Sequence, residues 1–143
     1  MLGAFSVVVG GIASALGGFD VILKFLVTLM AIDYLTGLII AIVWKKSPKT
    51  SGGGVESHQS VKGLFRKGGM LLVVYLGVQL DLVTGTDFVR NMVIMFFIGN
   101  EGISVMENLG IMGVKYPPFI ANAFEVLKER NSEAEIVRPE VSN

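Results

Sequence analysis

The stretch that most constrains this chain runs from Phe25 to Trp44 and reads FLVTLMAIDYLTGLIIAIVW. An α-helix rises about 1.5 Å per residue, so roughly 20 apolar residues match the ~30 Å hydrocarbon core of a bilayer. The stretch ends abruptly in the basic segment Lys45-Lys46-Ser47-Pro48-Lys49, which is unusual for a buried helix of a soluble domain. We therefore interpret residues 25–44 as a membrane-spanning helix with Asp33 near its middle.

The composition agrees with a membrane protein. Of the 143 residues, 52% are hydrophobic and 17% are charged, whereas soluble domains usually carry about 25% charged residues. The 18 glycines fit the close packing of transmembrane helices. The net charge is zero, but basic residues gather in the middle of the chain and acidic residues near its C-terminus, a distribution that bears on topology rather than on nucleic acid. The sequence thus predicts an all-α membrane protein that forms a single membrane domain over residues 1–143.

The segment before this span, residues 1–24, predicts a hydrophobic, glycine-rich helix. Ala13-Ser14-Ala15 resembles a signal-peptide cleavage site, but the positively charged region that such peptides need is missing. Two interpretations stay open, a fourth span or a helix that lies in the membrane interface. Gly17-Gly18 predicts a turn, and Asp20 and Lys24 are spaced to pair on one side of a helix.

The rest of the chain predicts two more spans and a tail. Residues 45–67 form a basic loop, rich in Ser and Gly over residues 47–60, which we expect to be flexible. Residues 68–84 and 88–112 are the second and third spans, separated by a tight turn at residues 84–87. The tail, residues 117–143, begins with Pro117-Pro118 and a short amphipathic helix over 119–130, and we expect residues 131–143 to be disordered. One face of that helix carries Phe119, Ala123, Phe124 and Leu127.

The basic loop predicts the topology. It holds six basic residues and one acid, Glu56, so the positive-inside rule places it in the cytoplasm; the basic residues are Lys45, Lys46, Lys49, Lys62, Arg66 and Lys67. The turn at 84–87 then lies outside and the C-terminus lies in the cytoplasm. Attraction of these residues to anionic lipid is compatible with this arrangement. We expect a protease on the cytoplasmic side to reach residues 51–58 and the tail.

Ionisable side chains within the spans are the candidates for function, because each costs about 2.5–3.5 kcal/mol at the centre of a spanning helix. Asp33 shares one side of its helix with Thr36 and Gly37, and the small residue there suits close helix packing. Asp33 either only hydrogen-bonds a neighbouring helix or lies beside a hydrated lumen. Asp81 either marks the outer interface or has a functional position.

The second half of the third span carries a polar stripe. Asn100, Ser104, Glu107 and Ile111 follow a 4,3,4 spacing, and Glu101 and Asn108 adjoin them. A stripe of this kind does not face lipid, so it either lines water or approaches the cytoplasmic interface. The candidate pore-lining or oligomer-contact residues are therefore Asp33, Thr36, Gly37, Asp81, Asn100, Glu101, Ser104 and Glu107.

The sequence gives little support to an enzyme. It has no cysteine, its single histidine, His58, lies in the Gly/Ser-rich segment, and Gly52-Gly53-Gly54 lacks the flanking residues of a phosphate-binding loop. We therefore expect no catalytic residue, no metal site and no cofactor. An ion or proton pathway stays open as an alternative, although the broken helices or inverted repeats of many carriers are not evident.

Several short motifs follow one another along the chain. They are Asp33-x-x-Thr36-Gly37, the basic pairs Lys62-Gly63 and Arg66-Lys67, Leu80-Asp81, the segment GNEGISVMEN over residues 99–108, Gly113, and Pro117-Pro118. Together, from about residue 25 to residue 127, they resemble the toxin-secretion/phage lysis holin family, which includes the clostridial toxin-secretion holins. The longer, glycine-rich N-terminal segment departs from that pattern.

The resemblance implies a multi-pass protein of the bacterial cytoplasmic membrane that homo-oligomerises into large lesions. Such lesions depolarise the cell and let a cell-wall hydrolase or a toxin cross, which causes timed lysis. The implied partners are further copies of the chain, the lipid bilayer and, functionally, the hydrolase, with no nucleic acid. Asp33, Asn100, Glu101 and Glu107 would then line or support the opening. The alternatives are a small ion or proton conductor, an antiholin, and a membrane anchor that recruits a partner through residues 119–130.

Overall fold

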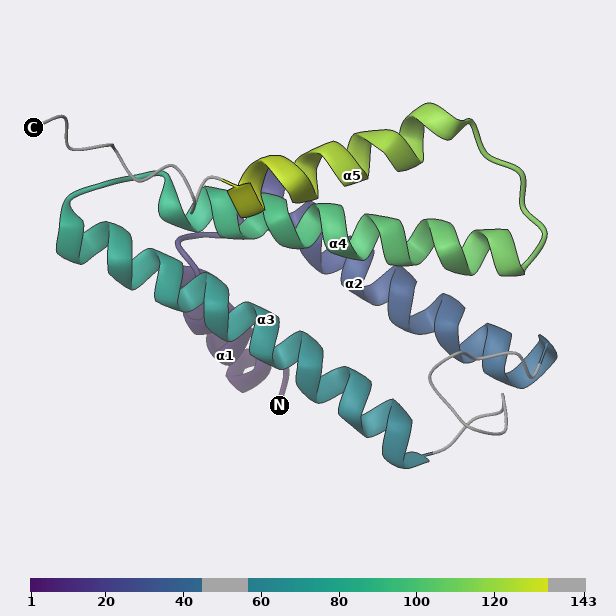
Figure 1. The fold of residues 1–143 in the computed structure, drawn as a ribbon. Helices are drawn as coiled ribbons and strands as arrows, with labels where there is room; N and C mark the ends of the chain where they lie inside the picture. The colour runs from purple at the N-terminus through teal and green to yellow at the C-terminus, as the bar shows by residue number, and fades with distance from the viewer. Residues whose placement is uncertain (45–56, 134–143) are drawn as a thin grey trace, which may run out of the picture.

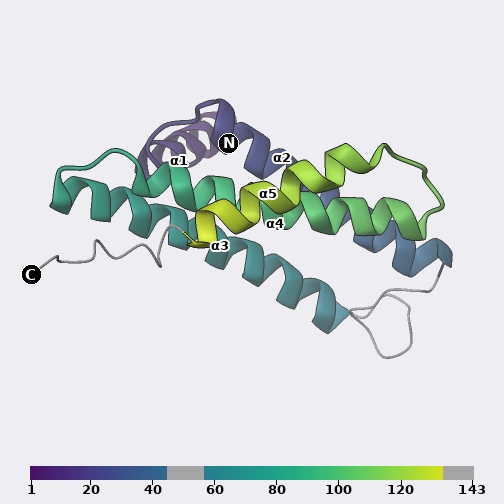
Figure 2. The same ribbon diagram turned by 45° about the horizontal axis from the view of Figure 1, so that its top comes forward.

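The computed structural model describes residues 1–44 and 57–133, and all regular structure within these ranges is helical. The central helices are α2 (Val21–Ile39), continued by the π-helical turn η1 (Ile40–Trp44), α3 (Ser57–Thr84) and α4 (Val89–Ile111). A fifth helix, α5 (Pro118–Glu133), runs antiparallel along α4, and the short α1 (Leu2–Ala15) lies near the start of α2 (Figures 1 and 2). The all-helical class is confirmed for these residues.

The start of α2 is fixed by a cap. The Asp20 carboxylate accepts a hydrogen bond from the backbone N–H of Leu23 at 3.1 Å, which satisfies a donor that the first turn leaves unpaired. Gly17 and Gly18 precede it with φ angles of 86° and 97°, so the predicted turn is confirmed. Because of this cap, the helix begins four residues before the predicted start of the span at Phe25.

The start of α3 corrects one prediction. Residues 57–67 were expected to belong to the loop over 45–67, but they are helical, and that part of the prediction was wrong. Gln, Lys and Arg favour helix, and the spacing of the basic residues sets Lys62 and Arg66 on the exposed side. Residues 45–56, with Lys45, Lys46 and Lys49, lie outside the described residues. So do residues 134–143 of the tail expected to be disordered, whereas residues 131–133 belong to α5.

The turn between α3 and α4 is confirmed. Gly85 has a φ of 69°, which suits glycine in a tight reversal. The Asp81 carboxylate accepts three hydrogen bonds across it, from the Thr86 hydroxyl at 2.6 Å and from the backbone N–H groups of Val89 and Arg90 at 3.0 Å each. Asp81 therefore ties the end of α3 to the first turn of α4.

Replacing Asp81 by alanine is expected to destabilise the protein, because it removes the side chain that accepts hydrogen bonds from the first turn of α4. The measurement is unfolding of the purified protein in detergent micelles. The matched control is Asp87→Ala, an exposed acid of the same turn, which should change stability by less than about 0.5 kcal/mol. Equal effects of the two substitutions would show that Asp81 has no special role in the turn.

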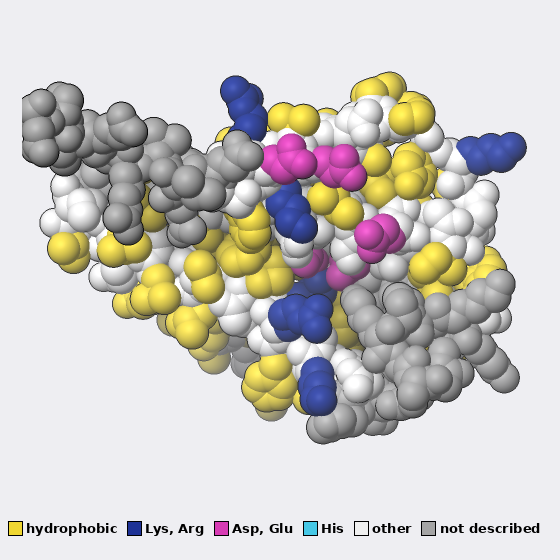
Figure 3. Space-filling view, viewed as in Figure 1, with side chains coloured by type: hydrophobic (Ala, Val, Ile, Leu, Met, Phe, Trp, Pro, Cys, Tyr) yellow, Lys and Arg dark blue, Asp and Glu magenta, His cyan; other side chains and the backbone are white. Residues whose placement is uncertain are grey.

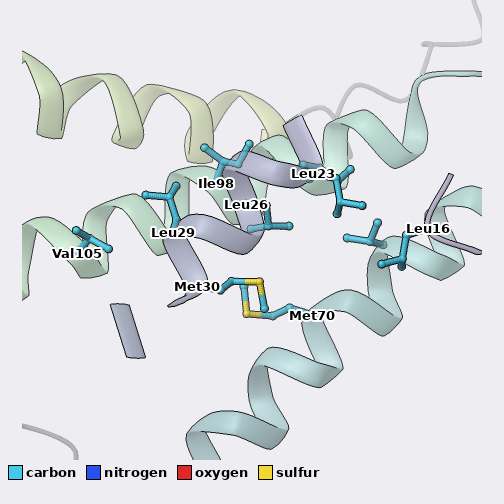
Figure 4. Close-up of a cluster of buried hydrophobic side chains, with 10 residues drawn as sticks. Leu16, Leu23, Leu26, Leu29, Met30, Met70, Ile98 and Val105 are labelled. Carbon is cyan, nitrogen blue, oxygen red and sulfur yellow. The ribbon is translucent and has the colours of Figure 1, made fainter. Parts of the chain in front are cut away.

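The core lies where α2, α3 and α4 meet (Figure 4). On α2 the fully buried Leu23 and Leu26 continue at helical spacing to Met30, which faces Met70 of α3. The other core side chains are Leu16, Leu29, Val74, Ile94, Ile98 and Val105. The core is therefore a narrow strip along one face of each central helix.

Most apolar side chains lie outside this core. Among the described residues, two helices are long and apolar enough to cross a membrane, Val21–Trp44 and Gln59–Thr84, with 33% and 17% of their most apolar windows buried. Exposed examples are Ile42 at 63% and Leu72 at 60%. This low burial is unlike that of a core helix in a soluble protein and suits contact with lipid. The predicted three or four spans are not confirmed, because α4 is not among these two helices and the 14 residues of α1 rise only about 21 Å.

The amphipathic helix of the tail is present but turns a different face inward. Phe124 and Leu127 pack against the core, as expected from their spacing, whereas Phe119 is 70% exposed and Ala123 is exposed. The inward face instead follows residues 120, 121, 124, 127, 128 and 131, which are all partly buried. This face packs along α4, so α5 belongs to the helix assembly and is not a separate tail.

Candidate functional site

Three charged side chains from three helices meet inside the bundle. Lys67 of α3 places its Nζ 2.8 Å from Oδ2 of Asp33 on α2, and it also donates to Oε2 of Glu101 on α4. The three side chains are 11%, 3% and 5% exposed, respectively. We call Asp33, Lys67 and Glu101 the ionic cluster.

Each member occupies a core position of its helix. Asp33 follows Met30 on the buried face of α2, and Lys67 precedes Met70 and Val74 on the buried face of α3. On α4 the buried face runs through residues 94, 98, 101, 105 and 108, at alternating spacings of four and three. Because such spacing keeps side chains on one side of a helix, the three charged side chains point into the space between α2, α3 and α4.

A second polar contact joins α2 and α4 beside the ionic cluster. The Asn108 amide donates to Asp33 Oδ1 at 3.1 Å and to the Thr36 hydroxyl at 2.9 Å. Thr36 in turn donates to the carbonyl of Ile32 at 2.7 Å. A Cβ added to Gly37 would lie 4.0 Å from the Asn108 nitrogen, an ordinary van der Waals contact, so Gly37 borders the amide. The DxxTG motif thus faces α4.

This arrangement makes the polar contacts important for holding the helices together. In lipid, apolar surface gives little drive for helix association, so packing and interhelical hydrogen bonds carry more of it. Buried charges also tolerate separation poorly, because each loses its partner in a medium of low polarity. The ionic cluster therefore acts as a tie between α2, α3 and α4 that is strong when complete and unfavourable when its one cation, Lys67, is missing.

The structure brings together only part of the predicted set. Asp33, Thr36, Gly37 and Glu101 meet at the ionic cluster or beside it, whereas Asp81 binds the turn between α3 and α4. Asn100 and Ser104 are half-buried, and Glu107 is exposed. The buried polar face of α4 is therefore displaced by one residue from the predicted stripe.

Sequence reasoning missed two members of the site. Lys67 was assigned only to topology, and Asn108 was noted only as a neighbour of the stripe. The signal was the spacing, because Ile94 and Ile98 continue to Glu101 and Asn108 in steps of three and four, and Lys67 precedes Met70 and Val74 in the same way. Among residues 1–44 and 57–133, no group of three His, Cys, Asp or Glu side chains is placed to hold a metal ion.

A second ion pair fixes the linker between α1 and α2. The Arg90 guanidinium donates to both carboxylate oxygens of Asp20, at 2.8 and 3.1 Å, and to the carbonyls of Leu16 at 2.5 Å and Gly18 at 2.9 Å. The expected pair of Asp20 with Lys24 was therefore wrong. Lys24 instead lies over the Phe19 ring, 5.6 Å from its centroid.

Comparison with known proteins decides the family. Residues 10–129 match the model described as the bacteriophage holin family. The chain belongs to the bacteriophage holin family. This is a family of non-enzymatic membrane proteins, and the two apolar helices fit a membrane location. No solved structure matches the chain significantly.

Several relatives of this holin-family chain align over most of their length. A protein named "Probable holin" from Bacillus phage phi105 is 30% identical over 112 residues, which cover 78% of this chain and 77% of the relative. An uncharacterized protein of Listeria monocytogenes is 33% identical over 122 residues, covering 83% and 80%. An uncharacterized 14.9 kDa protein of the nagH 3′ region of Clostridium perfringens is 33% identical over 116 residues, covering 80% and 82%.

The Arg90–Asp20 pair gives this holin-family chain a pH-dependent contact. The hydrogen-bonded Arg90 guanidinium holds the pKa of the Asp20 carboxyl below its ordinary value of 3.8, although partial desolvation acts in the opposite direction. Because the pKa is lower in the folded state, the ionised carboxylate contributes stability above about 3.8, and this contribution is lost as the pH falls through the folded pKa.

The corresponding prediction compares the native chain with Asp20→Asn by unfolding in detergent micelles. The native chain is expected to be the more stable at neutral pH, because only an ionised Asp20 pairs with Arg90. The difference is expected to shrink in acid, below the folded pKa of Asp20. A difference that stays constant from neutral to strongly acidic pH would show that the charge of Asp20 contributes nothing.

Proposed function

We propose that this chain is a holin, that is, a protein whose copies assemble in the bacterial cytoplasmic membrane into lesions that a cell-wall hydrolase crosses. The observation that carries the proposal is the family match over residues 10–129, together with a relative named probable holin. The two apolar helices with lipid-compatible outer faces support it. A chain of 143 residues cannot enclose a wide opening by itself, so many copies must line it.

The topology we propose follows from the charges. Helices α2 and α3 cross the membrane, and the segment between them, with the exposed Lys62 and Arg66 at its α3 end, lies in the cytoplasm. The turn around Gly85 then faces outside, and α4 carries the chain back to the cytoplasmic side, with α5 folded back along it. Engineered cysteines near Lys62 and Gly85 should be labelled by membrane-impermeant thiol reagents from opposite sides.

The mechanism we propose has two arrangements of the same helices. In the closed arrangement, the ionic cluster keeps the carboxylates of Asp33 and Glu101 paired and away from lipid. In the assembled lesion these groups turn to water, where charge is well solvated, and the half-buried Asn100 and Ser104 and the exposed Glu107 extend the polar lining. The smooth surface at Gly37 serves close packing between helices.

The proposal is tested by inducing the chain in a bacterium that also expresses a cytoplasmic cell-wall hydrolase, while membrane potential and enzyme escape are followed. We expect abrupt depolarisation together with hydrolase-dependent lysis. A catalytically dead hydrolase is the control, since it should escape without lysing the cells. Depolarisation without enzyme escape would instead indicate a small ion conductor, and insertion without either effect would indicate an antiholin or an anchor.

A further inference from the structure

Helix α5 fits into a groove that α4 forms with two glycines. A Cβ added to Gly99 would lie 2.6 Å from the backbone nitrogen of Lys128 and from the carbonyl oxygen of Phe124. A Cβ added to Gly102 would clash with the Phe124 ring. Phe124 also pairs with Phe25 of α2, with ring centroids 6.3 Å apart. The middle of α4 can therefore take a helix at this distance only because both positions lack a side chain.

The outer side of α5 carries charged and polar side chains beside the exposed Ala123 and Val126, although α5 lies beside the middle of α4. Asn122, Glu125 and Glu129 are exposed there. Acidic and basic side chains gather in a band over α5 and across towards α3 on the face shown in Figure 3. Charged side chains at membrane depth are costly. The side of α4 that α5 covers therefore cannot face lipid while α5 is docked on it.

The docked helix is also separate from the ionic cluster. The cluster is built from α2, α3 and α4, and α5 joins α4 through residues 112–117, where Gly113 has a φ of 82°. Detachment of α5 would therefore leave the ionic cluster in place. It would uncover the Gly99 and Gly102 face of α4, and small residues on a helix face permit close helix contact in membranes.

We propose that α5 is a removable cover, an intramolecular contact that blocks self-association through the glycine face of α4 until it is released. When α5 leaves, the same face receives a helix of a second copy of the chain. This inference rests on the proposed function for its meaning in the cell. Its test, however, measures self-association and the exposure of α5, and neither measurement requires lysis.

The first experiment releases α5 by Phe124→Asp, which places a charge in the groove. The matched control is Val126→Asp, the same change at an exposed position of the same helix, where the native side chain is 49% exposed. Multimers are counted by chemical crosslinking in membranes at equal protein level. We expect the multimer fraction to rise by on the order of tenfold with Phe124→Asp and to stay unchanged with Val126→Asp. Equal or fewer multimers with Phe124→Asp would overturn the proposal.

The second experiment measures the release of α5 without placing a charge in the groove. The chain has no cysteine, so single cysteines at Leu127 and Val126 report on the packed and the exposed side of α5. Leu127→Cys should react slowly with a thiol reagent before multimers form and as fast as Val126→Cys afterwards. Equal reactivity before assembly, or lasting protection of Leu127→Cys after it, would overturn the proposal. Multimers with the expected labelling but no hydrolase escape would refute the holin function alone.

Discussion

Replacing Lys67 by methionine is expected to weaken the helix bundle by about 3–5 kcal/mol, the usual effect of removing one partner of a buried ion pair. The substitution keeps an unbranched side chain of similar length but leaves the carboxylates of Asp33 and Glu101 facing one another with their shared ammonium gone. Carboxylates left without their cation in an apolar site are strongly unfavourable, so the helices are expected to separate more easily. Unfolding of the purified protein in detergent micelles measures the loss.

The matched control is Lys62→Met. Lys62 is exposed on the same helix, and its replacement should change stability by less than about 0.5 kcal/mol. A further variant, Lys67→Met with Asp33→Asn and Glu101→Gln, should recover much of the lost stability, because it removes the unpaired charges. If Lys67→Met and Lys62→Met behaved alike, the ionic cluster would not hold the helices together.

Replacing Asp33 by asparagine is expected to act on function in the opposite sense, by delaying or abolishing lysis while the protein still inserts. The amide keeps the size of the side chain and retains hydrogen bonding with Asn108, and Lys67 retains Glu101. A carboxylate gains more than an amide on moving from a buried site to water, so the substitution favours the closed arrangement. A bias of about 1.4 kcal/mol would lower the opened population roughly tenfold.

The time from induction to depolarisation measures this effect at matched membrane levels of the protein. Asp87→Asn is the control, because Asp87 is an exposed acid of the α3–α4 turn, away from the ionic cluster. We expect normal timing for Asp87→Asn and late or absent depolarisation for Asp33→Asn. Unchanged timing for Asp33→Asn would mean that Asp33 serves only as a helix contact.

Much of the fold followed from local signals. Apolar length marked the segments that became α2, α3 and α4, and glycine and aspartate marked the turns at Gly17 and Gly85, because these residues act within a few positions of themselves. The errors concerned segments where local composition misleads. Residues 57–67 look like a loop because they are polar and basic, but one face of them continues the core strip of α3.

The candidate site was only partly predictable, because it depends on how helices distant in sequence turn towards one another. Asp33 and Glu101 were identified from the rarity of charge in apolar segments. Their common partner, Lys67, lies 34 residues from each of them and had an adequate explanation in the positive-inside rule. Asp20 was predicted to pair with Lys24. The structure instead pairs it with Arg90, 70 residues away, through both carboxylate oxygens.

The central claim is that the ionic cluster holds a closed arrangement whose opening makes the lesion. The most direct test is the onset of depolarisation and hydrolase escape in cells that express Lys67→Met or the native chain at equal membrane levels. The account predicts an earlier onset for Lys67→Met, because the inserted helices lose the tie between them. A later or unchanged onset, with the protein inserted and multimers present, would contradict it.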